Sequence, residues 1–256
     1  MLHTYDGIVV GRREVGDNSC FIDILTDERG IVEAAAHGAK KINSSLLSCS
    51  SLFSYSTFCL SHSRQRYTVN SAKPKYSFHE LGGDIVRLAL ASYFAQAVRF
   101  CTPSEQRQTG ADSLVRFMAI ALYELNAVGS GGRTADVVRA AFELRFCANL
   151  GYRPDLTACA NCGQYDSPSG MFFLPDRGEL ICSDCFNREY GGERTKLLHE
   201  TLCAMRSIIY APLERCFKLS VGTQAQRQLS DVAEHYFLTR TERSFGALEY
   251  YKSLVQ

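Results

Sequence analysis

Four cysteines in the second half of the chain have the spacing of metal ligands. They form two Cys-x-x-Cys pairs, Cys159-Ala-Asn-Cys162 and Cys182-Ser-Asp-Cys185, and nineteen residues separate one pair from the other. Each pair can close a tight turn that points both thiolates the same way, and two facing turns supply the four tetrahedral ligands of zinc. Four thiolates leave no coordination position for water. The spacing therefore predicts one structural Zn²⁺ ion.

The residues between the two pairs predict a β-hairpin, the body of a zinc ribbon. Apolar stretches at residues 171–174 and 179–181 flank the turn sequence Pro175-Asp-Arg-Gly178. Gly163 follows the first pair, where a positive φ costs little. The alternatives are two disulfides or a redox Cys-x-x-Cys. A redox motif usually follows a strand and opens a helix, and nothing here indicates an oxidising compartment.

The composition bounds the class of protein. The 256 residues can form one large domain or two modest ones, and 46% are apolar, enough for a core. The formal net charge is +1, so an anion-binding surface would have to be local. No signal peptide or membrane span is visible, and we expect a soluble cytosolic protein. We expect the other seven cysteines to be buried thiols: Cys20, Cys49, Cys59, Cys101, Cys147, Cys203 and Cys216.

Five short β-strands are predicted in the first 80 residues. They fall at residues 5–15, 19–26, 31–37, 52–60 and 67–72, with turn signals between them. Gly30 ends one turn at a position that favours a left-handed backbone. This size and strand count suit a small closed barrel of the OB fold, with an SH3-like barrel as the alternative.

A helical period begins near residue 80 and continues to the end of the chain. Helices are predicted at residues 84–101, 111–127, 134–150 and 195–210, with a last pattern from residue 229 and a shorter tail after it. Thr134 and Thr195 are the expected N-caps, and Gly151 stops the third helix. The expected fold class is thus α+β multidomain. An OB-fold domain at 1–79 precedes an α-helical domain at 80–256, with the zinc finger inserted at about 155–190.

Sequence motifs of the common enzymes that use nucleotides, zinc or a serine nucleophile are missing. The chain has no Gly-x-x-x-x-Gly-Lys-[Ser/Thr], no His-Glu-x-x-His and no Gly-x-Ser-x-Gly, and none of the six histidines begins His-x-Glu. We therefore expect a protein that is not an enzyme. One alternative is a zinc-ribbon protein–protein adaptor without direct DNA binding. Another is a zinc-containing nuclease or transferase built on scattered carboxylates.

The order of motifs resembles the RecO family of bacterial recombination mediators. Similar segments are Gly7-Ile-Val followed by Arg12-Arg13, Leu25-Thr-Asp-Glu-Arg-Gly30, Gly38-Ala-Lys-Lys41, and Phe142-Glu-Leu-Arg145 through Leu150-Gly-Tyr-Arg-Pro154. The first cysteine pair then falls where the finger of that family begins. Two departures are His37, which replaces a usual Lys, and Ser50-Ser-Leu-Phe53, which replaces Leu-Gln-Pro-Phe.

The resemblance implies a function in DNA repair and recombination by the RecFOR pathway. Such proteins bind single- and double-stranded DNA and anneal complementary strands without ATP. With RecR they load RecA onto strands coated by single-strand-binding protein, whose acidic C-terminal tail they recognise. The resemblance also implies a cytoplasmic, nucleoid-associated protein with no membrane partner.

Basic residues at strand ends and loops of the barrel are the candidate DNA contacts, because annealing requires phosphate charges to be neutralised. The predicted DNA-binding residues are Arg12, Arg13, Lys40, Lys41, Arg64, Arg66 and Lys73. Tyr55, Tyr67 and Tyr76 could stack on bases or pack in the core. For the tail-binding pocket, Arg133, Arg139 and Arg145 lie on one predicted helix, but their spacing does not place them on one face.

Overall fold

The computed structural model describes residues 2–63, 66–102, 113–129, 134–186 and 192–255. The chain divides into two compact units, Met1–Asn126 with Phe245–Gln256, and Ala127–Ser244. Of the helices in the described residues, none has the length and apolar character needed to cross a membrane.

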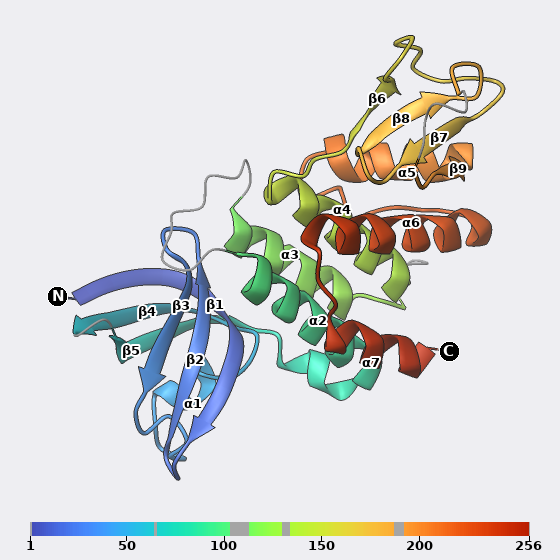
Figure 1. Ribbon diagram of the computed structural model, residues 1–256. Helices are drawn as coiled ribbons and strands as arrows, with labels where there is room; N and C mark the ends of the chain where they lie inside the picture. The colour runs from blue at the N-terminus through green and yellow to red at the C-terminus, as the bar shows by residue number, and fades with distance from the viewer. Residues whose placement is uncertain (1, 64–65, 103–112, 130–133, 187–191, 256) are drawn as a thin grey trace. The chain divides into compact units, whose positions relative to one another are not determined.

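The first unit is built on a closed five-stranded barrel (Figure 1). Its strands, in chain order, are β1 (Leu2–Val15), β2 (Ser19–Thr26), β3 (Gly30–Ala36), β4 (Ser54–Ser63) and β5 (Arg66–Ser77). They close in the order β1-β2-β3-β5-β4, with β3 and β5 parallel and β1 paired to both β2 and β4. This is the OB fold, and the prediction is confirmed.

Alternation along the strands fills the inside of the barrel. In β4, Phe58 and Leu60 point inward and are fully buried, while the alternating residues Thr57 and Cys59 are half-buried. β1 runs so close to β2 that a Cβ at Gly7 would lie 2.6 Å from the Leu25 carbonyl oxygen. Only glycine permits this approach of the two backbones.

The first unit also contains helices. They are α1 (Leu46–Cys49), the 3₁₀ helix η1 (His79–Gly83), α2 (Ile85–Cys101), α3 (Leu114–Asn126) and the C-terminal α7 (Gly246–Val255). The side chain of Asp84 caps α2 by accepting from the Val86 and Arg87 amides. Arg99 of α2 pairs with Asp23 of β2 at 2.7 Å. Figure 1 shows α7 beside α2, although most of the chain separates the two in sequence.

The second unit combines three helices with a small sheet. The helices are α4 (Ala135–Asn149), α5 (His199–Tyr210) and α6 (Thr223–Thr241), and the strands are β6 (Asp155–Cys159), β7 (Met171–Leu174), β8 (Glu179–Cys182) and β9 (Thr195–Leu197). The sheet order is β6-β8-β7-β9, and α4 packs on both α5 and α6. The Thr134 hydroxyl accepts from the Val137 amide, which confirms the predicted N-cap.

Three sequence predictions differ from the structure. Thr195 does not cap a helix, because Thr195–Leu197 pairs with β7 and α5 begins at His199. Cys203 is exposed on α5, so the prediction that it is buried is wrong, and Cys59 and Cys101 are half-buried. The helix expected at 111–127 begins at Leu114, and its first predicted residue lies outside the described residues.

Candidate metal centre and nucleic-acid interface

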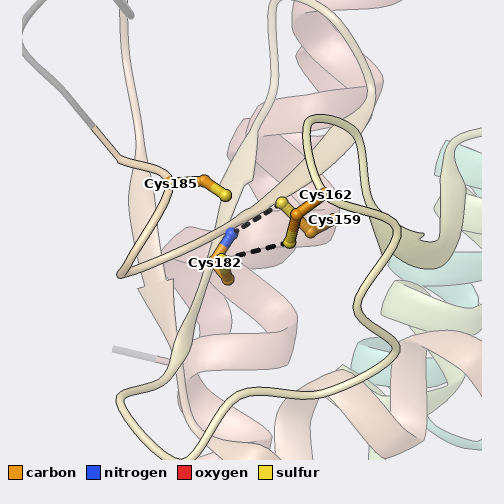
Figure 2. A group of neighbouring side chains, drawn as sticks. All are labelled: Cys159, Cys162, Cys182 and Cys185. Atoms are coloured by element: carbon orange, nitrogen blue, oxygen red, sulfur yellow. Dashed lines mark hydrogen bonds between the residues drawn. The ribbon is translucent and has the colours of Figure 1, made fainter.

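The two cysteine pairs meet at one end of the small sheet. Cys159 ends β6 and Cys182 ends β8, and these strands lie side by side in parallel. Each pair closes a turn: the Gly163 amide donates to the Cys159 carbonyl at 2.9 Å, and the Phe186 amide donates to the Cys182 carbonyl at 3.0 Å. Gly163 has φ +72°, as its position after the first pair predicts. Figure 2 shows the four side chains converging.

The geometry of the four sulfurs fits a tetrahedral metal ion. All four Sγ atoms lie within 4.8 Å of one another, and Cys162 Sγ is 3.8 Å from Cys182 Sγ. Zinc–sulfur bonds of about 2.3 Å place the corners of a tetrahedron about 3.8 Å apart. A disulfide would need about 2.05 Å, and all eleven cysteines are free thiols. The four cysteines can therefore hold one metal ion.

Backbone donors favour the thiolate form at one of these ligands. Burial of Cys159 opposes ionisation, yet the amide groups of Cys162, Cys182 and Asn161 outweigh it and lower the pKa of the Cys159 thiol to about 6. The Cys182 amide lies 3.3 Å from Cys159 Sγ. Burial raises the pKa of Cys182 to about 12. A bound dication would stabilise the thiolate form of all four cysteines and release the protons that the remaining thiols keep.

The predicted DNA-binding residues of the barrel divide by position. Register places Arg13, Phe21 and Ala35 side by side across β1, β2 and β3, on the outer face of the sheet. Arg66 precedes Tyr67, which pairs with Ala34, so Arg66 flanks the opposite side of the same β2–β3 face. In OB folds this face and the loops beside it are the usual nucleic-acid surface.

Lys40 and Lys41 follow β3 and lie next to the β1–β2 turn. The Lys40 amide donates to the Asn18 carbonyl at 3.2 Å, and its ammonium pairs with Glu14 at 2.9 Å. The structure therefore brings both lysines to the side of the β2–β3 face on which Arg13 lies.

Lys73 lies elsewhere on the barrel. It is opposite Thr57 of β4, which in turn is opposite Asp6 of β1. Lys73 is thus separate from the β2–β3 face, and Arg64 lies outside the described residues.

The barrel cations also differ in their partners. Arg13 pairs with Glu33 at 3.4 Å and lies 5.2 Å from the centroid of the Phe21 ring. By contrast, four exposed cations form no ion pair with a described carboxylate: Arg12, Lys41, Arg66 and Lys73. These four are the most accessible to a phosphate.

Aromatic residues sort into core and surface positions. Tyr67 is buried against the His62 ring, and Tyr55 lies half-buried under the Lys75 ammonium. Tyr76 is 48% exposed. Phe21, half-buried on the β2–β3 face, was not among the predicted candidates. The alternation of β2 could have identified it, since Ile22 and Ile24 face inward.

Two arginines considered for a tail-binding pocket are used inside the second unit. Arg139 is buried and pairs with Glu143 and Glu234. Arg145 donates to the Ile208, Ile209 and Ala211 carbonyls at the end of α5. Arg133 lies outside the described residues.

These features define an OB-barrel protein whose helical part carries a four-thiolate ribbon. Two family models together match nearly the whole chain. The model described as "Recombination protein O N terminal" matches residues 1–78, and "Recombination protein O C terminal" matches residues 82–249.

The chain belongs to the RecO family. Two of its relatives are each named "DNA repair protein RecO". The protein of Symbiobacterium thermophilum is 29% identical over 99% of this chain and 98% of its own length. That of Alkaliphilus metalliredigens is 30% identical over 99% of this chain and all of its own length. The chain is thus a DNA repair protein of this family.

Proposed function

We propose that the chain is a recombination mediator that binds single- and double-stranded DNA through its barrel and anneals complementary strands without ATP. The observation that carries the proposal is the basic margin of the β2–β3 face, with Arg13, Lys40 and Lys41 on one side and Arg66 on the other. Cations there can neutralise two phosphate backbones at once and let like-charged strands approach.

Ion pairs within the barrel bear on the mechanism. Lys40 and Arg13 are each paired with a carboxylate, so a phosphate would compete with Glu14 or Glu33 for them. Lys41 and Arg66 need no such exchange. They are therefore the first contacts of an approaching strand, and the affinity falls as salt rises.

The proposal includes three partners beyond DNA. With RecR, the protein loads RecA onto DNA coated by single-strand-binding protein, whose C-terminal tail it binds. It acts in the bacterial cytoplasm at the nucleoid and catalyses no covalent step. The four cysteines hold one Zn²⁺ that supplies folding free energy to the ribbon and no open coordination position. The support is the family and the thiolate geometry.

The test is strand annealing with complementary oligonucleotides, without ATP, across a salt series. Rapid annealing that slows as salt rises is expected. In direct binding, Lys41→Ala/Arg66→Ala should lower the slope of log affinity against log salt by about 1 for each lost phosphate contact. Lys218→Ala, an exposed lysine of the other unit, is the matched control.

Absence of annealing and binding at every salt concentration would contradict the proposal. A zinc-ribbon adaptor that contacts only proteins would then be the better interpretation. Loss of labelled DNA on incubation with magnesium would instead indicate a nuclease. The loading step is checked by RecA filament formation on coated DNA, which should require both this chain and RecR.

A further inference from the structure

A second group of chemically active side chains lies outside the metal cluster. Asp166 precedes β7, His199 is the first residue of α5, and Cys203 follows one helical turn later. His199 Nδ1 is 3.2 Å from Asp166 Oδ2, and His199 Nε2 is 3.4 Å from Cys203 Sγ. The imidazole therefore links a carboxylate to a thiol. In this arrangement the thiol can act as a nucleophile, the imidazole as its base and the carboxylate as the group that orients the base.

The surrounding backbone fixes each member of this triad. Asp166 Oδ1 accepts from the Ser167 amide at 2.9 Å, which leaves Oδ2 to face the ring. His199 and Cys203 are four residues apart on α5 and share one helix face. A carboxylate at Nδ1 holds the proton there, so Nε2 is the acceptor that faces the thiol. Both ring nitrogens are thus engaged, which favours proton transfer over metal ligation.

The thiol is exposed, and a hollow lies next to the imidazole that faces it. All eleven cysteines lie within the described residues, and Cys203 is the exposed one outside the metal cluster. His199 and Asp166 line a hollow of about 480 Å³ with Met171, Leu197 and Leu202. A small molecule can therefore rest on an apolar floor beside the imidazole.

We infer that Cys203 is a thiol-modification site that reacts with low-molecular-weight disulfides. His199 is the catalytic base and Asp166 its positioning residue. Nε2 takes the thiol proton, and the Cys203 sulfur attacks one sulfur of the disulfide. The old S–S bond breaks as a new one forms to Cys203, and the leaving thiolate takes the proton back from the imidazolium. Cys203 is oxidised to a mixed disulfide, and one free thiol is released.

Disulfide exchange suits this triad better than acyl transfer. It needs a thiolate and a proton carrier, but neither an oxyanion hole nor a dry cavity. The His199 side chain is 72% exposed, so water reaches it. Such a modification would place a bulky, polar group on the face of α5 that carries His199.

The test is the rate of reaction of the metal-loaded full chain with two disulfides. One is an aromatic disulfide that releases a coloured thiolate, and the other is glutathione disulfide. Peptide mass mapping should place the first modification on Cys203. Cys203→Ser should abolish the fast phase, and Cys59→Ser, a change at a half-buried cysteine of the barrel, should leave it unchanged.

The roles of His199 and Asp166 are tested by the leaving group. His199→Gln should slow the reaction with glutathione disulfide by about tenfold or more, since general acid–base assistance is lost. The aromatic thiolate leaves without a proton, so the effect on that reagent should be smaller. Asp166→Asn should show the same difference between the reagents, which a loss of local structure would not produce.

Two results would overturn the inference. One is a Cys203 rate equal to that of a free cysteine peptide with both reagents. The other is a His199→Gln variant that reacts with glutathione disulfide as fast as the native chain does.

Discussion

At the scale of single residues, Arg139 is a buried cation that pairs with Asp136, Glu143 and Glu234 within the second unit. Its guanidinium pairs with Glu143 at 3.2 Å and Glu234 at 2.5 Å, and also donates to Ser230. Glu143 is fully buried, and Arg139 is 5% exposed. The contacts with Glu234 and Ser230 join α4 to α6, so Arg139 links elements that are far apart in sequence.

Replacing Arg139 should destabilise the chain strongly. Arg139→Met removes the cation that faces a buried carboxylate, and the free energy of unfolding should fall by about 3 kcal/mol. Arg227→Ala, at an exposed arginine of α6, should change it by less than about 0.5 kcal/mol. Urea unfolding measures both. Equal effects of the two variants would show that the buried pairs contribute nothing specific.

Cys162 tests the metal centre at the same scale. Cys162→Ser removes one of four ligands, so the chain should lose its metal and its melting temperature should fall by roughly 5–10 °C. DNA affinity should change less, because the barrel lies in the other unit. Metal analysis and calorimetry are the measurements. Cys203→Ser, at the other exposed cysteine, should keep its metal. Full metal content in Cys162→Ser would contradict the four-ligand assignment.

At the scale of elements, Gly7 permits the close approach of the paired strands β1 and β2. A Cβ there would lie 2.5 Å from Ile24 Cγ2 and 2.6 Å from the Leu25 carbonyl oxygen, and a backbone atom cannot move aside cheaply. Gly7→Ala should lower the free energy of unfolding by about 2 kcal/mol. At Gly82 an added Cβ meets no described atom within 4 Å, so Gly82→Ala is the control. Equal stabilities of the two variants in urea would argue against the close approach of the two backbones at Gly7.

Asp6 makes the stability of the barrel depend on pH. Hydrogen bonds from Lys75 and then Thr57 lower the pKa of the Asp6 carboxyl below its usual value. The ionised form therefore favours the folded state. That contribution is present above the unfolded pKa of about 3.9 and disappears as pH falls through the folded pKa.

Melting temperatures of the native chain and Asp6→Asn should therefore converge as pH falls from about 6 to about 2. Asp17→Asn, exposed in the β1–β2 turn, controls for a general change of charge. A difference between native chain and Asp6→Asn that stays constant over this range would show that the ion pair is not linked to folding.

Local sequence signals predicted most helices and strands correctly. They failed where contacts between residues far apart in the sequence determine the structure. The cysteine spacing and the Thr134 cap are visible within a few residues, and both predictions agree with the structure. Thr195 carries the same local signal as Thr134, but β9 pairs with β7 and the helix starts four residues later. Likewise, the sequence around Arg139 does not reveal its buried ion pair, because its partner Glu234 lies 95 residues further on.

At the scale of the whole molecule, packing and sequence divide the chain at different places. The sequence predicts domains at 1–79 and 80–256, and the family models divide the chain at nearly the same place. Packing instead groups α2, α3 and α7 with the barrel. Arg99 of α2 pairs with Asp23 of β2, and the Ser113 hydroxyl before α3 donates to Asp27. Both contacts join these helices to the barrel.

Removal of the metal distinguishes the two divisions. Chelation should unfold the ribbon, and amide exchange should accelerate in β6–β9 and in α5, which packs on β6. If packing defines the cooperative units, α2 and α3 should keep their protection together with β1–β5. Hydrogen exchange with mass spectrometry on metal-loaded and chelated protein measures this. Faster exchange in α2 and α3, with exchange in the barrel unchanged, would instead support a boundary near residue 80. The two helices would then lose their protection together with the ribbon.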